Sequence, residues 1–263
     1  MLMGIVNVTA DSFSDGGRFL DADAAVAHAR RLIAEGADWL DIGGESTRPG
    51  AEPAAAADEV ARVVPVIETL RRVSDIRISV DTMKPAVARA AIAAGATMWN
   101  DVTALAWSPD SLATAAALGS EVVLMHMQGE PRTMQKRPHY DDVVGEVAAF
   151  LASRAEAAIA AGVARDKIWV DPGFGFGKTS AHNVALVRGL PQLAALGFPI
   201  VFGASRKSSI SKLAGDASNA GERLGGSIAL ALVAAKAGAA MLRVHDVAET
   251  RQALAVAAAI GDA

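Results

Sequence analysis

The chain contains no cysteine among its 263 residues. This absence excludes disulfide bridges, thiolate nucleophiles, and zinc or iron–sulfur sites that use cysteine ligands. The five histidines do not form the HExxH pattern of zinc peptidases either. Redox chemistry at sulfur and zinc-dependent proteolysis are therefore not expected.

Long hydrophobic runs and concentrated charge are also missing. No run of 18 apolar residues occurs, and the N-terminal MLMGIVNVT lacks the basic stretch and long apolar core of a signal peptide. The formal net charge is -4, and the 25 lysines and arginines are spread along the chain. Without a basic patch there is no electrostatic footprint for nucleic acid. We expect a soluble, cytoplasmic protein that binds neither membrane nor nucleic acid.

Aromatic residues make up only 5% of the chain, whereas apolar residues, largely alanine, make up 52%. Short β-branched or apolar runs alternate with alanine-rich stretches of helical spacing. The predicted strands are LMGIVN (2–7), WLDIGG (39–44), IRISVD (76–81), TMWND (97–101), VVLMHM (122–127), KIWVD (167–171), IVFGAS (200–205) and MLRVH (241–245). The predicted helices include residues 22–35, 57–72, 84–94, 142–161 and 222–238. This pattern predicts an α/β fold of one domain spanning 1–263, a (β/α)8 TIM barrel.

Nearly every predicted strand is apolar until its end and then delivers a polar residue. One such residue could simply begin a turn or cap a helix, but so many ends converging on one face of a barrel indicate an active site there. Asp81, Asn100 and Asp171 suit the hydrogen-bond donor edge of a planar heterocycle. A cationic set predicts a substrate that carries phosphate, and it comprises Arg48, Arg206, Lys207, Arg243 and His245. Asp246 and Glu249 are predicted to be the N-cap and the third residue of the helix that follows the last strand.

Three other site types were weighed against this pattern. The run DPGFGFGKT resembles a nucleotide-binding loop, but Pro172 stands where that loop needs glycine. GASRKS resembles a nucleophile elbow, but Lys207 takes the place of its second glycine. The carboxylates at strand ends could serve a glycosidase, yet few aromatic platforms lie nearby and the cations would be unexplained. The carboxylates considered for that role are Asp41, Glu45, Asp81 and Asp171.

Eight motifs spread over the whole chain resemble the dihydropteroate synthases in order and spacing. They are IVNVTADSFSDGG (5–17), DIGGESTRPG (41–50), ISVDT (78–82), WND (99–101), LMHMQGEPRTMQ (124–135), DPGFGFGKTSAHN (171–183), GASRKS (203–208) and RVHDV (243–247). The resemblance implies a transferase of folate biosynthesis that joins 6-hydroxymethyl-7,8-dihydropterin diphosphate to p-aminobenzoate. Pyrophosphate leaves, 7,8-dihydropteroate forms, and sulfonamides are expected to inhibit.

The resemblance also implies roles for individual residues. The pterin would contact Asp81, Asn100, Met125, Asp171 and Lys207. The diphosphate would contact Asn7, Thr47, Arg48, Arg243 and His245, with Asn7 as the ligand of a Mg2+ cofactor. The p-aminobenzoate would lie among Phe13, Thr47, Pro49, Phe176, Arg206, Lys207 and Ser208. Catalysis would rest on Lys207, Arg243, His245 and Asp15, while Lys178 would be a surface or supporting residue.

The same resemblance implies a homodimer, and the apolar stretch SIALALVAAKAGAAM (227–241) is the candidate surface, although ordinary barrel packing could also explain its composition. Two alternatives share the pterin-binding residues. One is a methyltransferase domain that passes a methyl group from a folate to a corrinoid protein, and this domain would have no use for a diphosphate clamp. The other is a non-catalytic pterin-binding paralogue.

Overall fold

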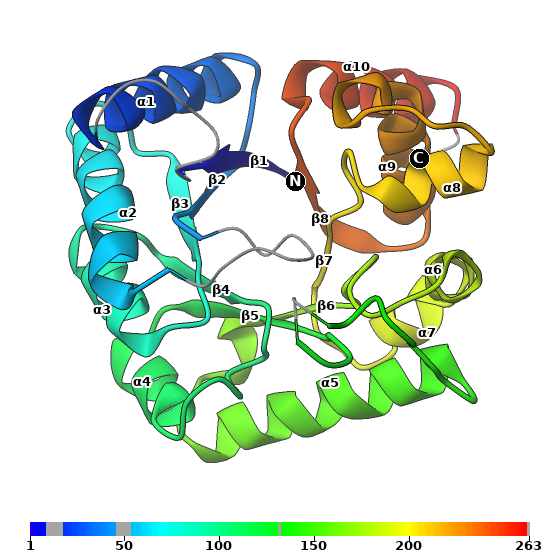
Figure 1. Cartoon of the computed structure of the whole chain (residues 1–263), viewed down its shortest axis with the longest axis horizontal. Coiled ribbons are helices and arrows are strands. Elements are labelled where there is room, and N and C mark those ends of the chain that lie inside the picture. The colour runs from blue at the N-terminus through cyan, green and yellow to red at the C-terminus, as the bar shows by residue number, and fades with distance from the viewer. Residues whose placement is uncertain (9–17, 46–53, 131–132, 262–263) are drawn as a thin grey trace.

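The computed structural model describes residues 1–8, 18–45, 54–130 and 133–261, without the side chains of residues 18–21. Eight parallel strands form a closed barrel in which each strand pairs with the next and β8 pairs with β1. Figure 1 shows the helices surrounding these strands. The predicted (β/α)8 barrel is confirmed. The strands are β1 Leu2–Asn7, β2 Trp39–Gly43, β3 Arg77–Asp81, β4 Met98–Asp101, β5 Glu121–Met125, β6 Ile168–Asp171, β7 Ile200–Phe202 and β8 Ala239–Val244.

The five helices predicted by range are present as α1, α2, α3, α5 and α9. Four helices of five to nine residues, α4, α6, α7 and α8, were not among the ranges predicted from the sequence. No helix of the described residues is long and apolar enough to span a bilayer. The helices are α1 Arg18–Ala34, α2 Ala56–Arg71, α3 Pro85–Ala93, α4 Ser111–Leu118, α5 Val143–Ala160, α6 Ser180–Arg188, α7 Leu190–Ala194, α8 Ser208–Ala214, α9 Leu224–Lys236 and α10 Val247–Ala259.

The main core lies between the outer face of the strands and the surrounding helices. It joins strand residues such as Val80 to helix residues such as Val63 and Leu70. Alanines of the helices, including Ala29 and Ala88, are completely buried in this layer. Their small side chains let helix and strand backbones approach closely, which explains the alanine-rich composition.

Inside the barrel, a layer of large side chains from seven strands fills the lower part. It comprises Met3, Trp39, Met98, Val123, Trp169, Val201 and Met241. Because strand side chains alternate between the two faces, the residue two positions further along each strand also points inward, one layer higher. In β2, β4, β6 and β8 that residue is Asp41, Asn100, Asp171 and Arg243, respectively. In these four strands the inward-facing side chains therefore change from apolar to polar over one step of two residues.

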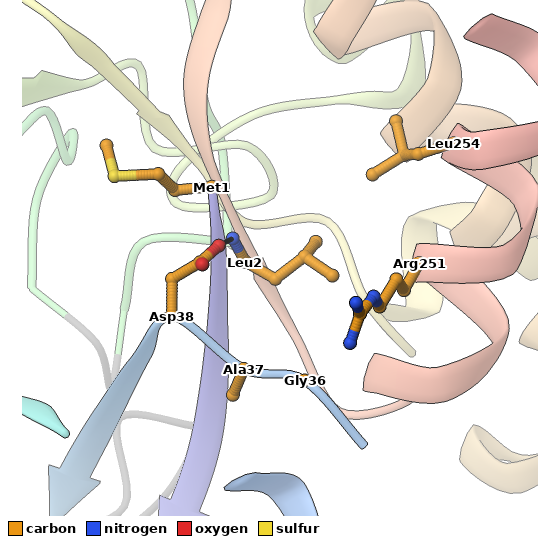
Figure 2. A pocket seen from close by; sticks show the side chains of 7 residues that line it. All are labelled: Met1, Leu2, Gly36, Ala37, Asp38, Arg251 and Leu254. Atoms are coloured by element: carbon orange, nitrogen blue, oxygen red, sulfur yellow. Dashed lines mark hydrogen bonds between the residues drawn. The ribbon is translucent and has the colours of Figure 1, made fainter. Parts of the chain in front are cut away.

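The opposite end of the barrel is closed by side chains rather than opened for chemistry. Arg77 lies over the Trp39 ring, 4.0 Å from its centroid, and forms an ion pair with Glu121. Glu121 also accepts a hydrogen bond of 2.6 Å from the Trp169 indole. A surface hollow of about 440 Å³ lies beside the start of β1. Figure 2 shows the residues that line it, among them Arg251 and Gly36. This hollow lies away from the carboxyl ends of the strands.

Candidate active site

The centre of the site is a cluster of one arginine and two carboxylates, which we call the mouth triad: Arg243, Asp41 and Asp81. The Arg243 Nε donates to Asp41 Oδ2 at 2.6 Å, and its Nη2 donates to Asp81 Oδ2 at 2.8 Å. Burial opposes the charge of the guanidinium, but Asp41 and Asp81 outweigh it and raise the pKa of Arg243. Burial raises the pKa of the Asp81 carboxyl, against the lowering effect of Arg243. The triad thus joins β8 to β2 and β3 across the barrel.

Asp41 connects this triad to Asn100. The Asn100 Nδ2 donates to the same Asp41 Oδ2 at 3.1 Å. Asp41 is completely buried, and its Oδ1 has no hydrogen-bond partner within the described part of the chain. The sequence placed Asp41 at a strand end but assigned it no role in pterin or phosphate binding. The sequence did contain a signal for Asp41, because a residue two positions after the inward-facing Trp39 also faces the interior of the barrel.

Asp171 ends β6 and is held by the loop that follows it. Its Oδ1 accepts a hydrogen bond of 2.6 Å from the Gly173 amide. Burial raises the pKa of Asp171, while the nearby Lys207 ammonium lowers it. The Lys207 Nζ donates to the Phe174 carbonyl and lies 4.5 Å from the centroid of the Phe176 ring. Burial lowers the pKa of Lys207 to about 8.

Residues 172–179, which we call loop 6, are shaped by glycines in the left-handed region. A side chain at Gly173 would place its Cβ 1.9 Å from the His126 carbonyl oxygen, and one at Gly177 would meet the Gln128 carbonyl at 2.4 Å. The amides of Gly173 and Gly175 already donate to Asp171 and Asn183. These two amides therefore already have partners within the protein, and we do not propose loop 6 as a phosphate site.

Met125 provides an apolar wall beside these polar groups. It is 4% exposed and packs in a small cluster with Met83 and Val102, against which Phe176 is also placed. The flat face of a bound heterocycle could contact this surface, while the polar residues hydrogen-bond to its edge. Asp81, Asn100, Met125 and Asp171 lie at the ends of β3 to β6, and Lys207 follows β7 at the N-cap of α8, so the five residues predicted to act together lie at one end of the barrel.

Two further members of the predicted cationic set, Arg206 and His245, follow β7 and β8. His245 Nδ1 lies 2.9 Å from the Ser205 hydroxyl. Arg206 adopts a positive φ of 58° and its guanidinium is paired with Asp246, with Nε to Oδ2 at 3.1 Å. Asp246 is the N-cap residue of α10 and Glu249 is the third residue of the helix, as predicted, although the Asp246 carboxylate binds Arg206 and makes no capping hydrogen bond. Ser208 is exposed at the start of α8.

Asn7 is the exposed last residue of β1. Among the described residues no cluster of three or more His, Cys, Asp or Glu side chains could form a complete metal site. Mg2+ often keeps several water ligands and binds substrate phosphates, so one exposed amide oxygen suits it. The donor set at Asn7 therefore fits an ion held mainly by the substrate. Phe13, Asp15, Thr47, Arg48 and Pro49 lie outside the described residues.

The sequence missed a second buried ionic cluster, which we call the side triad: Lys84, Glu45 and Glu59. The Lys84 Nζ lies 2.7 Å from both Glu45 Oε2 and Glu59 Oε2. Glu45 Oε1 also accepts from the Ala54 amide at 2.8 Å. These groups are 39 and 25 positions apart in sequence from Lys84, so only the packing of α2 beside α3 reveals them.

Comparisons with known proteins find relatives that match nearly the whole chain. A family model described as "Pterin binding enzyme" matches residues 3–245. A dihydropteroate synthase from Neisseria meningitidis is 50% identical over 99% of this chain and 92% of its own length. The solved dihydropteroate synthase of Xanthomonas albilineans in complex with 7,8-dihydropteroate is 51% identical, with a TM-score of 0.89, covering 98% of this chain and 92% of that one. The Yersinia pestis enzyme with a sulfonamide drug complex is 45% identical, with a TM-score of 0.93, covering 100% and 94%.

Proposed function

The chain belongs to the dihydropteroate synthase family, and from this premise we propose how its residues divide the work. The enzyme is a transferase that joins 6-hydroxymethyl-7,8-dihydropterin diphosphate to p-aminobenzoate, giving 7,8-dihydropteroate and pyrophosphate. The observation that carries the assignment of roles is the convergence of Asp81, Asn100, Asp171, Lys207 and Arg243 on one end of the barrel.

Asp81, Asn100 and Asp171 bind the donor edge of the pterin in this proposal. Ionised carboxylates are pure acceptors, and the pterin ring presents adjacent N–H groups that need them. Lys207 is proposed to donate to the opposite edge of the ring, and its ammonium is close enough to Asp171 for the two charges to interact. Met125 packs on the ring face. These contacts orient the methylene carbon toward the open end of the barrel.

Arg243 and His245 bind the diphosphate. A guanidinium matches phosphate oxygens with two parallel donors, and Arg243 already carries its charge at the centre of the site. As the methylene C–O bond breaks, its electron pair leaves with the pyrophosphate, and these cations stabilise the growing charge. The amine of p-aminobenzoate forms the new C–N bond and then loses a proton. Because an aniline nitrogen attacks without prior deprotonation, no strong general base is required.

Asn7 would hold a Mg2+ ion through its amide oxygen. When bound, such an ion would offset the negative charge of the leaving pyrophosphate. Asn7 itself is exposed at the end of β1, where it can reach a ligand bound across the barrel. Thr47 and Arg48 are proposed to complete the diphosphate site, as the sequence predicted.

Phe176, Lys207 and Ser208 are proposed to form the part of the p-aminobenzoate site that follows β6 and β7. The Phe176 ring is half-buried beside the Lys207 ammonium, which offers an aromatic surface next to a cation for the benzoate. Arg206 is assigned here too, after exchange of its Asp246 partner. Phe13, Thr47 and Pro49 complete this pocket, and Asp15 is assigned to catalysis, all from the sequence. A sulfonamide, as an analogue of p-aminobenzoate, would compete for it.

Two copies of the chain are proposed to pair through α9 and α10. Val233 on α9 is 51% exposed, and Val256 and Ile260 at the end of α10 are 57% and 71% exposed. The two helices contact each other, so these side chains can contribute to one apolar surface. A cytoplasmic location stays a prediction from the sequence.

A single incubation tests the catalytic proposal. The chain is mixed with the pterin diphosphate, Mg2+ and p-aminobenzoate, and the products are analysed by mass spectrometry. We expect 7,8-dihydropteroate and an equal amount of pyrophosphate, and neither when p-aminobenzoate is omitted. Binding of the pterin without any turnover would instead favour a non-catalytic pterin-binding protein. Methyl transfer from a methylated folate to a corrinoid would favour the methyltransferase, which the relatives do not support.

A further inference from the structure

One buried ionisable side chain near the site has no part in the proposed chemistry. Lys178 follows the glycines of loop 6 and is 3% exposed, so it is not the surface residue that the sequence allowed. Its Nζ lies 2.9 Å from His126 Nδ1 and donates to the Phe176 carbonyl at 2.9 Å and the His126 carbonyl at 3.3 Å. A buried ammonium with three acceptors is costly to desolvate, so its retention calls for a role.

The acceptors of Lys178 belong to two segments that line the site. His126 directly follows Met125, the apolar wall, and Phe176 is the aromatic residue of loop 6. Loop 6 is also held from its other side, where Lys207 donates to the Phe174 carbonyl. The Tyr140 hydroxyl adds a hydrogen bond of 3.0 Å to the Gly177 carbonyl. Lys178 is therefore the one group in this network that bonds both the end of β5 and the Phe176 backbone.

The charge of Lys178 is not neutralised by direct contact. Among the described residues no carboxylate lies within ion-pair distance of its Nζ, and its closest partner ring, His126, is neutral. Burial and the Lys178 charge together lower the pKa of His126 to about 3, so its Nδ1 acts as an acceptor. The carboxylate that Lys178 affects through space is Asp171, whose pKa it helps to lower together with Lys207 and Arg243.

We propose that Lys178 is a positioning residue of the pterin site, an inference that rests on the proposed function. It fixes Met125 and Phe176 relative to Asp171 through its hydrogen bonds. Its charge acts on Asp171 through space and favours the ionised carboxylate that the pterin donors require. Lys207 acts on the same carboxylate, so the two lysines oppose the effect of burial together.

The charges around Lys178 make this role depend on pH. Four titratable groups interact with it: Asp171 at the end of β6, Lys207 before α8, His126 after β5, and His182 on α6. Burial lowers the pKa of Lys178 to about 7. As the pH falls through this value, Lys178 gains its proton and opposes protonation of Asp171, whose pKa burial raises. Pterin binding by the native chain should therefore persist to lower pH than it would without Lys178.

The test compares Lys178→Met, which removes both charge and donors, with Lys178→Gln, which keeps neutral donors. Lys136→Met is the matched control, because Lys136 is exposed and lies outside the site. Binding of bare 6-hydroxymethylpterin is measured by calorimetry from about pH 5.5 to 8.5, around the ordinary range of histidine titration. We expect Lys178→Met to bind the pterin about tenfold more weakly at the acidic end. A tenfold change in affinity corresponds to a shift of one unit in the pKa of the coupled group, Asp171. The deficit should shrink at the alkaline end, where native Lys178 is also neutral.

A purely structural role would produce a deficit that is the same at every pH, and that result in both variants would overturn the proposal. Native affinity in Lys178→Met throughout would overturn it as well. If Lys178→Met does not fold, Lys178→Gln carries the test, because its acid limb should shift in the same direction. Failure of the native chain and of Lys136→Met to bind pterin would instead count against the proposed function.

Discussion

The mouth triad and the side triad have the same composition, one cation and two carboxylates, and we propose that they serve different purposes. Each has one completely buried carboxylate, Asp41 or Glu59, with one oxygen that has no partner in the described part of the chain. In each, the cation contacts both acids at 2.6–2.8 Å. Composition and distances alone would not reveal which triad belongs to the active site.

The difference lies in what surrounds each cluster. In the mouth triad, the Arg243 and Asp81 side chains keep exposures of 19% and 15%, and Lys207 and Asp171 lie within electrostatic reach. In the side triad, Lys84 stands at the N-cap of α3, and the second oxygen of Glu45 binds the backbone of Ala54. We propose that Arg243 of the mouth triad can exchange a carboxylate partner for a bound anion, whereas the side triad holds chain segments together.

Replacing Arg243 by Ala should have the largest effect on chemistry. The variant loses the cation that meets the diphosphate and leaves Asp41 and Asp81 as uncompensated buried acids. Removing one stabilising donor from a transition state costs about 100- to 1000-fold in rate, and here a full charge is lost, so we expect a fall near 1000-fold in kcat/KM. Steady-state kinetics on the folded variant measure it. Retention of more than a tenth of the native kcat/KM would show that the mouth triad is structural like its counterpart.

Lys84→Met tests the side triad in the opposite sense. Breaking a buried ion pair from one side costs about 3 kcal/mol, because the carboxylates stay buried without their cation. We expect the free energy of unfolding, measured by chemical denaturation, to fall by about that amount while kcat at saturating substrate stays near native. Adding Glu59→Gln should recover part of the loss, since burial already raises the pKa of Glu59 and its charge is a liability once Lys84 is gone. An unchanged unfolding free energy in Lys84→Met would contradict this account.

The contrast also explains what the sequence could predict. The strand ends at Asp81, Asn100, Asp171 and Arg243 were identified because parallel strands must deliver their last residues to one face. The contact of Arg243 with Asp41 could not be identified, because it depends on the height of each side chain inside the closed barrel. The interpretation of Lys178 as a surface residue was wrong for a similar reason. Its burial results from the packing of loop 6 against loop 5, the described residues after β5 up to Asp142.

Removal of Mg2+ should separate the two halves of the substrate. Asn7 and the ion are proposed to act on the phosphates alone, so chelation should weaken binding of the pterin diphosphate at least about tenfold and leave the bare pterin alcohol unaffected. Calorimetry with both ligands, with and without chelator, measures this. Equal loss for both ligands would remove Asn7 from the metal assignment.

Asp41→Asn gives the smallest and most discriminating effect when it is paired with Glu59→Gln. In the mouth triad this substitution removes the negative charge that orients Arg243. It also gives Asn100 an amide partner, which can act as donor or acceptor, in place of a carboxylate. We expect kcat/KM to fall about tenfold, the value of one charge-assisted hydrogen bond, while the unfolding free energy changes little because a buried charge is also removed. Glu59→Gln should do the reverse, lowering stability and sparing kcat/KM. The two isosteric substitutions, measured side by side, test whether the mouth triad and the side triad have different roles. If both variants lost activity and stability to the same extent, the two triads would not differ in role.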